Sequence, residues 1–82
     1  MEKEIGHITH YFDKAGVAII KLSSMLAVGD TLKFKRGDKE FTETVSSIQV
    51  EHESIQSAKA GDEVGVKVSR KIKEGTPVFK EE

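Results

Sequence analysis

The chain has 82 residues and a formal charge of −1, from thirteen Lys and Arg against fourteen Asp and Glu. This length accommodates one small domain, residues 1–82, and the balanced charge means that nucleic-acid contact would need a local basic patch. The lack of cysteine excludes disulfides and thiol chemistry, and the longest apolar run, residues 16–20, is too short to cross a membrane. We therefore expect a cytoplasmic protein with no membrane partner. The Lys- and Glu-rich composition without Cys or Trp also fits a thermophile.

Apolar residues recur with a period of two, which is typical of strands. Residues 4–12 form the first predicted strand, and a turn at 13–16 contains a glycine suited to a positive φ. The next strand, 17–22, is almost continuously apolar, which favours a central position with both lateral edges paired. A crossing segment and a turn occupy 25–30. The strand predicted at 31–35 alternates cleanly between apolar and basic residues.

A hairpin turn at 36–39 leads into one long predicted strand at 40–52. Val45 and Ile48 both have the character of core residues, yet their odd spacing places them on opposite faces of a regular strand. A β-bulge at 46–47 would turn both side chains inward, and bulges are how small barrels bend their strands. We therefore predict a bulge at this position.

Residues 54–60 are predicted as a loop, because this stretch is too short for a stable helix. A strand at 63–70 follows, and a turn at 73–76 leads into a last strand at 77–80, whose proline suits a strand start or an edge. Strands joined by glycine-containing turns, with no helix to cover a sheet, predict an all-β fold. We expect a small six-stranded, mainly antiparallel closed β-barrel, with this interior: Ile8, Val17, Ile19, Leu32, Phe34, Val45, Ile48, Val50, Val64, Val66 and Val68.

Several segments combine apolar strands with turn glycines in a fixed order. They are Ile5-Gly6-His7-Ile8 with Ala15-Gly16-Val17-Ala18-Ile19, then Leu26-Ala27-Val28-Gly29-Asp30-Thr31-Leu32, then Val45-Ser46-Ser47-Ile48-Gln49 with Ala58-Lys59-Ala60-Gly61-Asp62-Glu63-Val64-Gly65-Val66, and finally Ile72-Lys73-Glu74-Gly75-Thr76-Pro77-Val78. This ordered set resembles the β-barrel second domain of translational GTPases such as elongation factor Tu and initiation factor two. The resemblance implies a barrel fold and a role in translation, as a stand-alone domain without the GTPase domain.

The family's aminoacyl-end pocket does not transfer to this chain. Its acidic position falls on Gln49 and its basic position on Ser69, and both residues depart from the family pattern. There is also no glycine-rich phosphate loop and no length to hold one, which excludes a bound nucleotide.

Several residues are of types that catalyse reactions or bind metals, but they are more simply interpreted as solvent-exposed strand residues. His7 and His10 lie three apart, so on a regular strand they face opposite ways and cannot share an ion. The run 51–53, Glu-His-Glu, alternates in the same manner. No serine stands with a histidine and a carboxylate in a nucleophile motif. We therefore expect a protein that is not an enzyme and has no cofactor and no metal.

Basic residues gather in two groups and are the candidate contacts for RNA or another partner. One group surrounds the predicted 36–39 turn, and the other lies near the C-terminal strands: Lys33, Lys35, Arg36 and Lys39, then Lys67, Arg70, Lys71 and Lys73. The functional interpretation is contact with a phosphate backbone. The alternative is an ordinary charged surface that keeps exposed strands soluble, partly neutralised by neighbouring glutamates.

Two hypotheses for function remain open at this point. The first is a binding module that contacts RNA, the ribosome or another component of the translation machinery. The alternative is an accessory module that docks an enzyme or other protein, since barrels related to this family also occur as appended domains on non-translational proteins, including peptidase-like enzymes. A salt-dependent RNA shift lost in Lys33→Glu/Lys35→Glu favours the first, and salt-insensitive binding to one protein favours the alternative.

Overall fold

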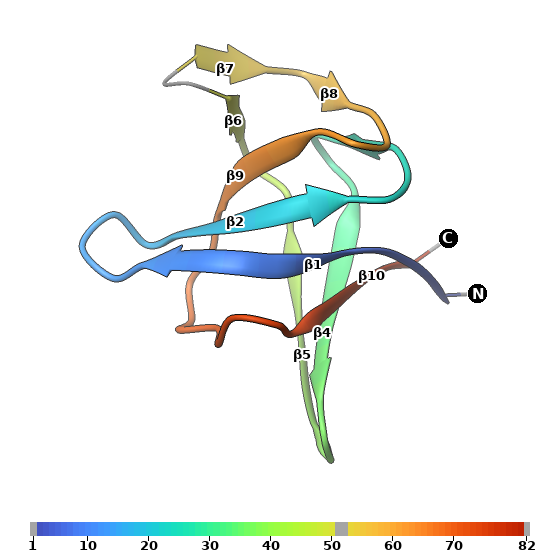
Figure 1. Cartoon of the computed structure of the whole chain (residues 1–82), viewed down its shortest axis with the longest axis vertical. Coiled ribbons are helices and arrows are strands. Elements are labelled where there is room, and N and C mark those ends of the chain that lie inside the picture. The colour runs from blue at the N-terminus through green and yellow to red at the C-terminus, as the bar shows by residue number, and fades with distance from the viewer. Residues whose placement is uncertain (1, 51–52, 82) are drawn as a thin grey trace.

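The computed structural model describes residues 2–50 and 53–81, which form strands and turns but no helix (Figure 1). The strands are β1 (Glu2–Phe12), β2 (Val17–Leu22), β3 (Leu26–Ala27), β4 (Thr31–Arg36), β5 (Lys39–Thr44), β6 (Ile48–Val50), β7 (Glu53–Ile55), β8 (Ser57–Ala58), β9 (Glu63–Lys67) and β10 (Pro77–Glu81). Every pairing identified between them is antiparallel. The all-β, antiparallel prediction is therefore confirmed. Within the described part of the chain there is no helix that could span a membrane.

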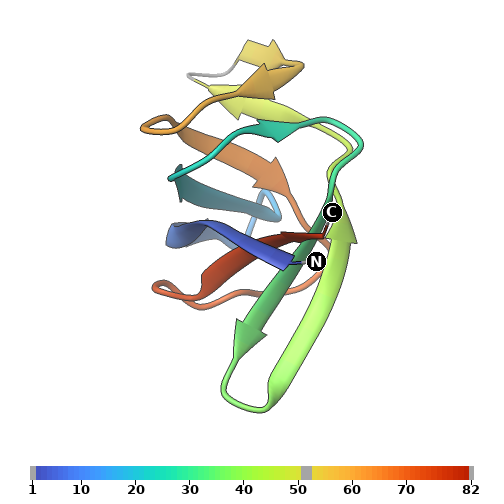
Figure 2. The same ribbon diagram turned by 90° about the vertical axis from the view of Figure 1, so that its right-hand side faces the viewer.

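The strands form one curled sheet and one small separate pair. The large sheet has the order β5-β4-β10-β1-β2-β9-β6-β7, and β3 pairs with β8. In Figure 1 the hairpin of β4 and β5 crosses β1 and β2 steeply, and Figure 2 shows the sheet wrapping around the interior. The terminal strands β5 and β7 of this order are not paired with each other in the described residues. The predicted closed, six-stranded barrel is therefore wrong, because the sheet remains open along β5.

The long strand predicted at 40–52 is divided. β5 pairs with β4, whereas β6 pairs with β7 and β9, so the chain changes partners at 45–47. The predicted bulge in this region is wrong, because these residues leave the sheet instead of remaining in one ladder. Val45 and Ile48 are nevertheless both buried, as expected, since the interruption frees them from strict alternation. Residues 51 and 52 lie outside the described part of the structure.

Irregular pairing occurs instead in β1, which shifts register against β10 between Glu4 and Gly6 and against β2 between Ile8 and His10. The first shift allows Ile5 and Ile8, three residues apart, to be buried on the same side. Gly6 lies so near β2 that an added Cβ would be 2.3 Å from the carbonyl oxygen of Lys21. The close pairing of β1 with β2 therefore requires glycine at position 6.

The interior contains most of the predicted core. Buried as expected are Ile8, Leu32, Phe34, Val45, Ile48, Val64, Val66 and Val68. The prediction for β2 was wrong, because Ala18 and Ile20 are buried there while Val17 and Ile19 are only half-buried. Val50 is also half-buried and packs against the edge of the core. A continuously apolar strand contains no alternation from which the inward face could be chosen. Buried residues that were not expected include Ile5, Leu22, Leu26, Ala58, Ile72 and Val78.

The loop predicted at 54–60 contains most of β7 and the whole of β8. β8 forms because Ala58 pairs with Leu26 of β3, far away in the sequence. At the C-terminal end, β10 begins at Pro77 as predicted for a proline. It is not an edge strand, however, because it pairs with both β1 and β4.

Candidate binding site

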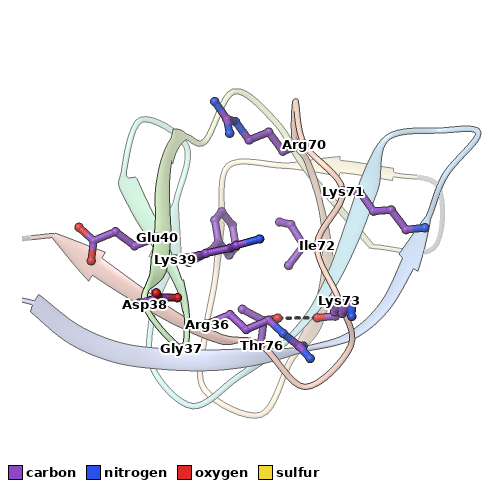
Figure 3. A pocket seen from close by; sticks show the side chains of 11 residues that line it. Arg36, Gly37, Asp38, Lys39, Glu40, Arg70, Lys71, Ile72, Lys73 and Thr76 are labelled. Atoms are coloured by element: carbon purple, nitrogen blue, oxygen red, sulfur yellow. Dashed lines mark hydrogen bonds between the residues drawn. The ribbon is translucent and has the colours of Figure 1, made fainter.

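A pocket of about 1120 Å³ lies at the open edge of the sheet, between the β4–β5 hairpin and the chain that joins β9 to β10 (Figure 3). It brings together members of both predicted basic groups, namely Arg36, Lys39, Arg70, Lys71 and Lys73. Residues more than thirty positions apart thus share one opening. We call this opening, with these five side chains, the cationic pocket.

The hairpin wall of the pocket ends in a two-residue turn. Gly37 has a φ of 62°, a left-handed conformation that glycine adopts without strain. Arg36 and Lys39 are paired across this turn. Because side chains alternate along each strand, Arg36 and Lys39 lie on the same face of the hairpin as the buried Phe34. The turn therefore directs two cations to the concave side of the sheet.

The opposite wall, residues 68–76, is anchored to the core. Val68 and Ile72 are buried, and the amide of Val68 donates a hydrogen bond of 2.9 Å to the carbonyl of Gly16. The hydroxyl of the buried Thr76 donates to the carbonyl of Lys73 at 2.6 Å, the dashed line in Figure 3. This wall is consequently a folded segment with fixed attachment points.

The edge is closed at one end of the pocket by a contact between β5 and this wall. The amide of Ser69 donates to Oε1 of Glu43 at 2.6 Å, and the Ser69 hydroxyl donates to the same oxygen. From there the pocket lining extends to Gly37 and Asp38 at the hairpin turn. The opening thus lies between the Glu43–Ser69 contact and the hairpin turn.

The charges that line the cationic pocket are unequal. Five cations and two carboxylates, Asp38 and Glu40, are among the residues that line it. In Figure 3 Lys39 projects across the mouth of the pocket, whereas Glu40 points away from it. The buried Phe34 and Ile72 supply an apolar floor. An anionic group at the rim and an apolar group below it both fit such a surface.

The other three predicted cations lie elsewhere. Lys33 Nζ is 3.7 Å from Oε1 of Glu40, and Lys35 Nζ lies 5.0 Å from the centroid of the Phe79 ring. Both project from β4 on the face opposite the interior. Lys67 is on β9 and borders a separate shallow hollow beside β2. The structure therefore unites five of the eight predicted residues and separates the rest.

A second feature, missed from the sequence, is a mostly apolar hollow of about 860 Å³ beside β2, with further lining from β1, β6 and β9. Its large apolar side chains, Phe12, Val17, Ile19 and Val50, are what we call the apolar patch, and polar side chains border them: His10, Lys14, Gln49 and Glu63. Phe12 is 53% exposed, and unlike a single exposed apolar residue it belongs to a group of apolar side chains that line one hollow. Gly65 lies beneath the patch, and its missing side chain deepens the hollow. The signal in the sequence was that β2 is apolar on both faces.

No group of three His, Asp or Glu residues is close enough to hold a metal ion within the described parts of the chain. His10 Nδ1 lies 3.1 Å from Oε2 of Glu74, and both side chains are exposed. Glu51 and His52, the first two residues of the Glu-His-Glu run at 51–53, lie outside the described residues.

The fold is a small all-β domain with two surface hollows, the cationic pocket and the one that holds the apolar patch. Solved structures of the C-terminal domain of a putative U32 peptidase from Geobacillus thermoleovorans have the same fold. One superposes with a TM-score of 0.89 at 22% identity, covering 98% of this chain and 93% of that chain. Its selenomethionine variant gives 0.86 at 20% identity, covering 93% and 96%.

Sequence comparison identifies a more specific similarity, to one protein. The chain is 36% identical over 77 residues to an uncharacterised protease of Methanocaldococcus jannaschii. The match covers 93% of this chain but 19% of that protein, so the chain spans about a fifth of its relative's length. No protein-family model matches the sequence.

These similarities correct the resemblance drawn from the sequence. The relatives are named as a protease and a peptidase, so the assignment to the second domain of translational GTPases is wrong. The expected partners, RNA and the ribosome or a translation protein, followed from that assignment and are wrong as well. The resemblance depended on turn glycines, and Gly29, Gly61 and Gly75 have φ values of 99°, 93° and 87°. Any small β fold with tight turns needs glycine at such positions, so their spacing does not identify a family.

Proposed function

We propose that this chain is a non-enzymatic accessory module that docks against a protease-family protein. The observation that carries the proposal is the match of nearly the whole chain to about a fifth of a protease. Most of that relative therefore lies outside the matched segment, where catalysis can be housed. The likeness of fold to a domain of a putative peptidase supports the same role.

The apolar patch is the docking face in this proposal. Phe12, Val17, Ile19 and Val50 form an apolar surface on strands held firmly in the sheet. Burying one large apolar side chain in an interface contributes about 1.5–3 kcal/mol, so a few such residues can hold two domains together. Exposed apolar area of this kind on a small domain is typical of a surface that is covered by another protein.

The test uses the Methanocaldococcus jannaschii protease, prepared once complete and once without its matched segment. We expect the chain to bind the shortened protease and not the complete one, whose own segment occupies the docking site. Analytical ultracentrifugation of the mixtures measures this. Equal binding to both proteins, or to neither, contradicts the proposal.

Two variants show whether the apolar patch is the contact. Phe12→Asp removes a 53% exposed aromatic ring from the patch, and Met25→Asp removes a 61% exposed side chain between β2 and β3. Both are exposed, so the fold should tolerate both changes, as circular dichroism would show. Phe12→Asp should abolish binding while Met25→Asp leaves it unchanged. The reverse result would move the docking face away from the patch.

The absence of catalysis is tested separately. The purified chain, incubated alone with a mixed peptide library, should leave every peptide intact by mass spectrometry. Reproducible cleavage that survives repurification would show that the module is itself an enzyme.

A further inference from the structure

We propose that the cationic pocket binds an extended acidic peptide segment, which adds to the sheet as a strand beside β5. The inference rests on the proposed docking function, because the segment would belong to the protein that the module accompanies. It uses a different surface from the apolar patch. The two proposals can therefore fail independently.

The first step of the argument is the free edge of β5. This strand is the last in the order of the large sheet and pairs only with β4 in the described structure. In an antiparallel hairpin, hydrogen-bonded and non-hydrogen-bonded pairs alternate, starting with a bonded pair next to a two-residue turn. Arg36 and Lys39 are that first pair. The backbone groups of Glu40 and Thr42 therefore point outward, where an extended peptide can pair with them.

The second step is the space beside that edge. The cationic pocket accompanies the hairpin end of β5, and the Glu43–Ser69 contact closes the edge farther along. An added strand advances about 3.3 Å per residue, so the open length accommodates a short segment of a few residues and not a whole strand. The wall at 68–76 then lies on the other side of the bound segment.

The third step is charge, which selects the ligand. Lys39 and Arg36 lie on the concave face of the hairpin, and Arg70, Lys71 and Lys73 line the pocket from the other wall, with Lys71 directed away from the hairpin in Figure 3. Side chains of an added strand alternate between the two faces, so every second one meets these cations. The remaining ones lie on the face where Lys33 Nζ is 3.7 Å from Oε1 of Glu40, so that face carries no excess of either charge close to the added strand. The favoured ligand therefore has acidic residues at alternate positions, separated by neutral ones.

The first experiment measures binding of a fluorescein-labelled peptide, Glu-Thr-Glu-Val-Glu-Thr-Glu, by fluorescence anisotropy. We expect a Kd on the order of 10 μM for this short peptide. A peptide of the same composition with its four glutamates in one block should bind at least tenfold more weakly. Equal binding of both peptides, no binding, or tighter binding of a single-stranded RNA of equal charge would overturn the proposal.

Matched charge reversals locate the site. Lys39→Glu changes an exposed cation that projects across the mouth of the cationic pocket and should weaken binding at least tenfold. Lys67→Glu changes an exposed cation on β9, outside the pocket, and should have less than a twofold effect. An equal or larger effect of Lys67→Glu than of Lys39→Glu would overturn the assignment to this pocket.

Strand addition is distinguished from simple charge attraction by methylating backbone amides of the peptide. In an added strand, one alternate set of amides faces β5 and the other faces away. Methylation of one set should abolish binding, and methylation of the other should change it less than twofold. If the two sets have the same effect, the peptide is not held as a strand.

The proposed function and this inference have separate outcomes. Phe12→Asp should abolish docking to the shortened protease and leave the affinity for the peptide unchanged. If the peptide fails to bind wild-type chain that still docks, the inference falls and the proposed function stands. If the peptide binds as described while docking fails, the peptide site stands and the docking proposal falls.

Discussion

Replacing Gly6 with alanine tests whether the close approach of β1 and β2 is a requirement of the fold. A Cβ at this position would lie 2.3 Å from the carbonyl oxygen of Lys21, a distance that real Cβ atoms do not reach. Gly6 is paired with Leu22 of β2 on one side and with Val78 of β10 on the other. β1 therefore cannot move away from β2 without pressing on β10.

The cost follows from that geometry. The Cβ–oxygen contact must lengthen from 2.3 Å to at least 3.0 Å, so the backbones of β1 and β2 must separate by a comparable distance. Backbone hydrogen bonds near 2.9 Å are then stretched beyond their useful range. Losing two or three bonds at about 0.5–1.5 kcal/mol each costs about 1–4.5 kcal/mol. A domain of this size has a free energy of unfolding of about 4–12 kcal/mol, so the loss is easily measured.

The assay is urea unfolding followed by far-ultraviolet circular dichroism, with Gly65→Ala as the control. At Gly65 a Cβ would meet methyl groups, Val17 Cγ1 at 3.0 Å and Ile19 Cδ1 at 3.3 Å. These contacts are with side chains that need to move by only a few tenths of an ångström, so we expect a smaller loss of about 1 kcal/mol. If Gly6→Ala and Gly65→Ala have the same urea midpoint, the close approach does not constrain the sheet and the reasoning is refuted.

Three further predictions concern the core and the walls of the cationic pocket. Ile20→Ala should lower the free energy of unfolding by about 2–5 kcal/mol and Ile19→Ala by about 1 kcal/mol or less, because only Ile20 is fully buried. Equal urea midpoints for the two variants would contradict the inward face assigned to β2. Ile72→Ala should cost about 2–4 kcal/mol and speed amide exchange along 68–76, because Ile72 anchors that wall; unchanged exchange would show that it does not. Glu43→Ala should cost about 1 kcal/mol and expose the Ser69 amide to exchange, as nuclear magnetic resonance would detect; continued protection would mean that another group holds this amide.

Local patterns were sufficient for the elements with clear alternation. Leu32 and Phe34 are buried in β4 while the lysines between and after them face outward, as the period of two predicts. The turn at 36–39 was predictable because Gly37 follows an alternating strand and precedes polar residues. Such features depend only on a few neighbouring residues, and their physics is therefore visible in the sequence.

Features that depend on distant partners were not predictable in this way. β8 exists because Ala58 meets Leu26, and the interruption at 45–47 exists because β5 and β6 have different neighbours. The sequence also did not show which face of β2 points inward. The alternate residues that start at Val17 are as apolar as those that start at Ala18. The apolar patch was missed for this reason.

The sequence by itself determined that this chain is all-β, where most of its turns fall, and that its basic residues form two groups. The tertiary structure alone decided that the sheet is left open along β5 and that Lys39 and Lys71, from different groups, line one pocket there. The physical reason is that alternation sets which way a side chain points, whereas the choice of neighbouring strand depends on the packing of the entire core.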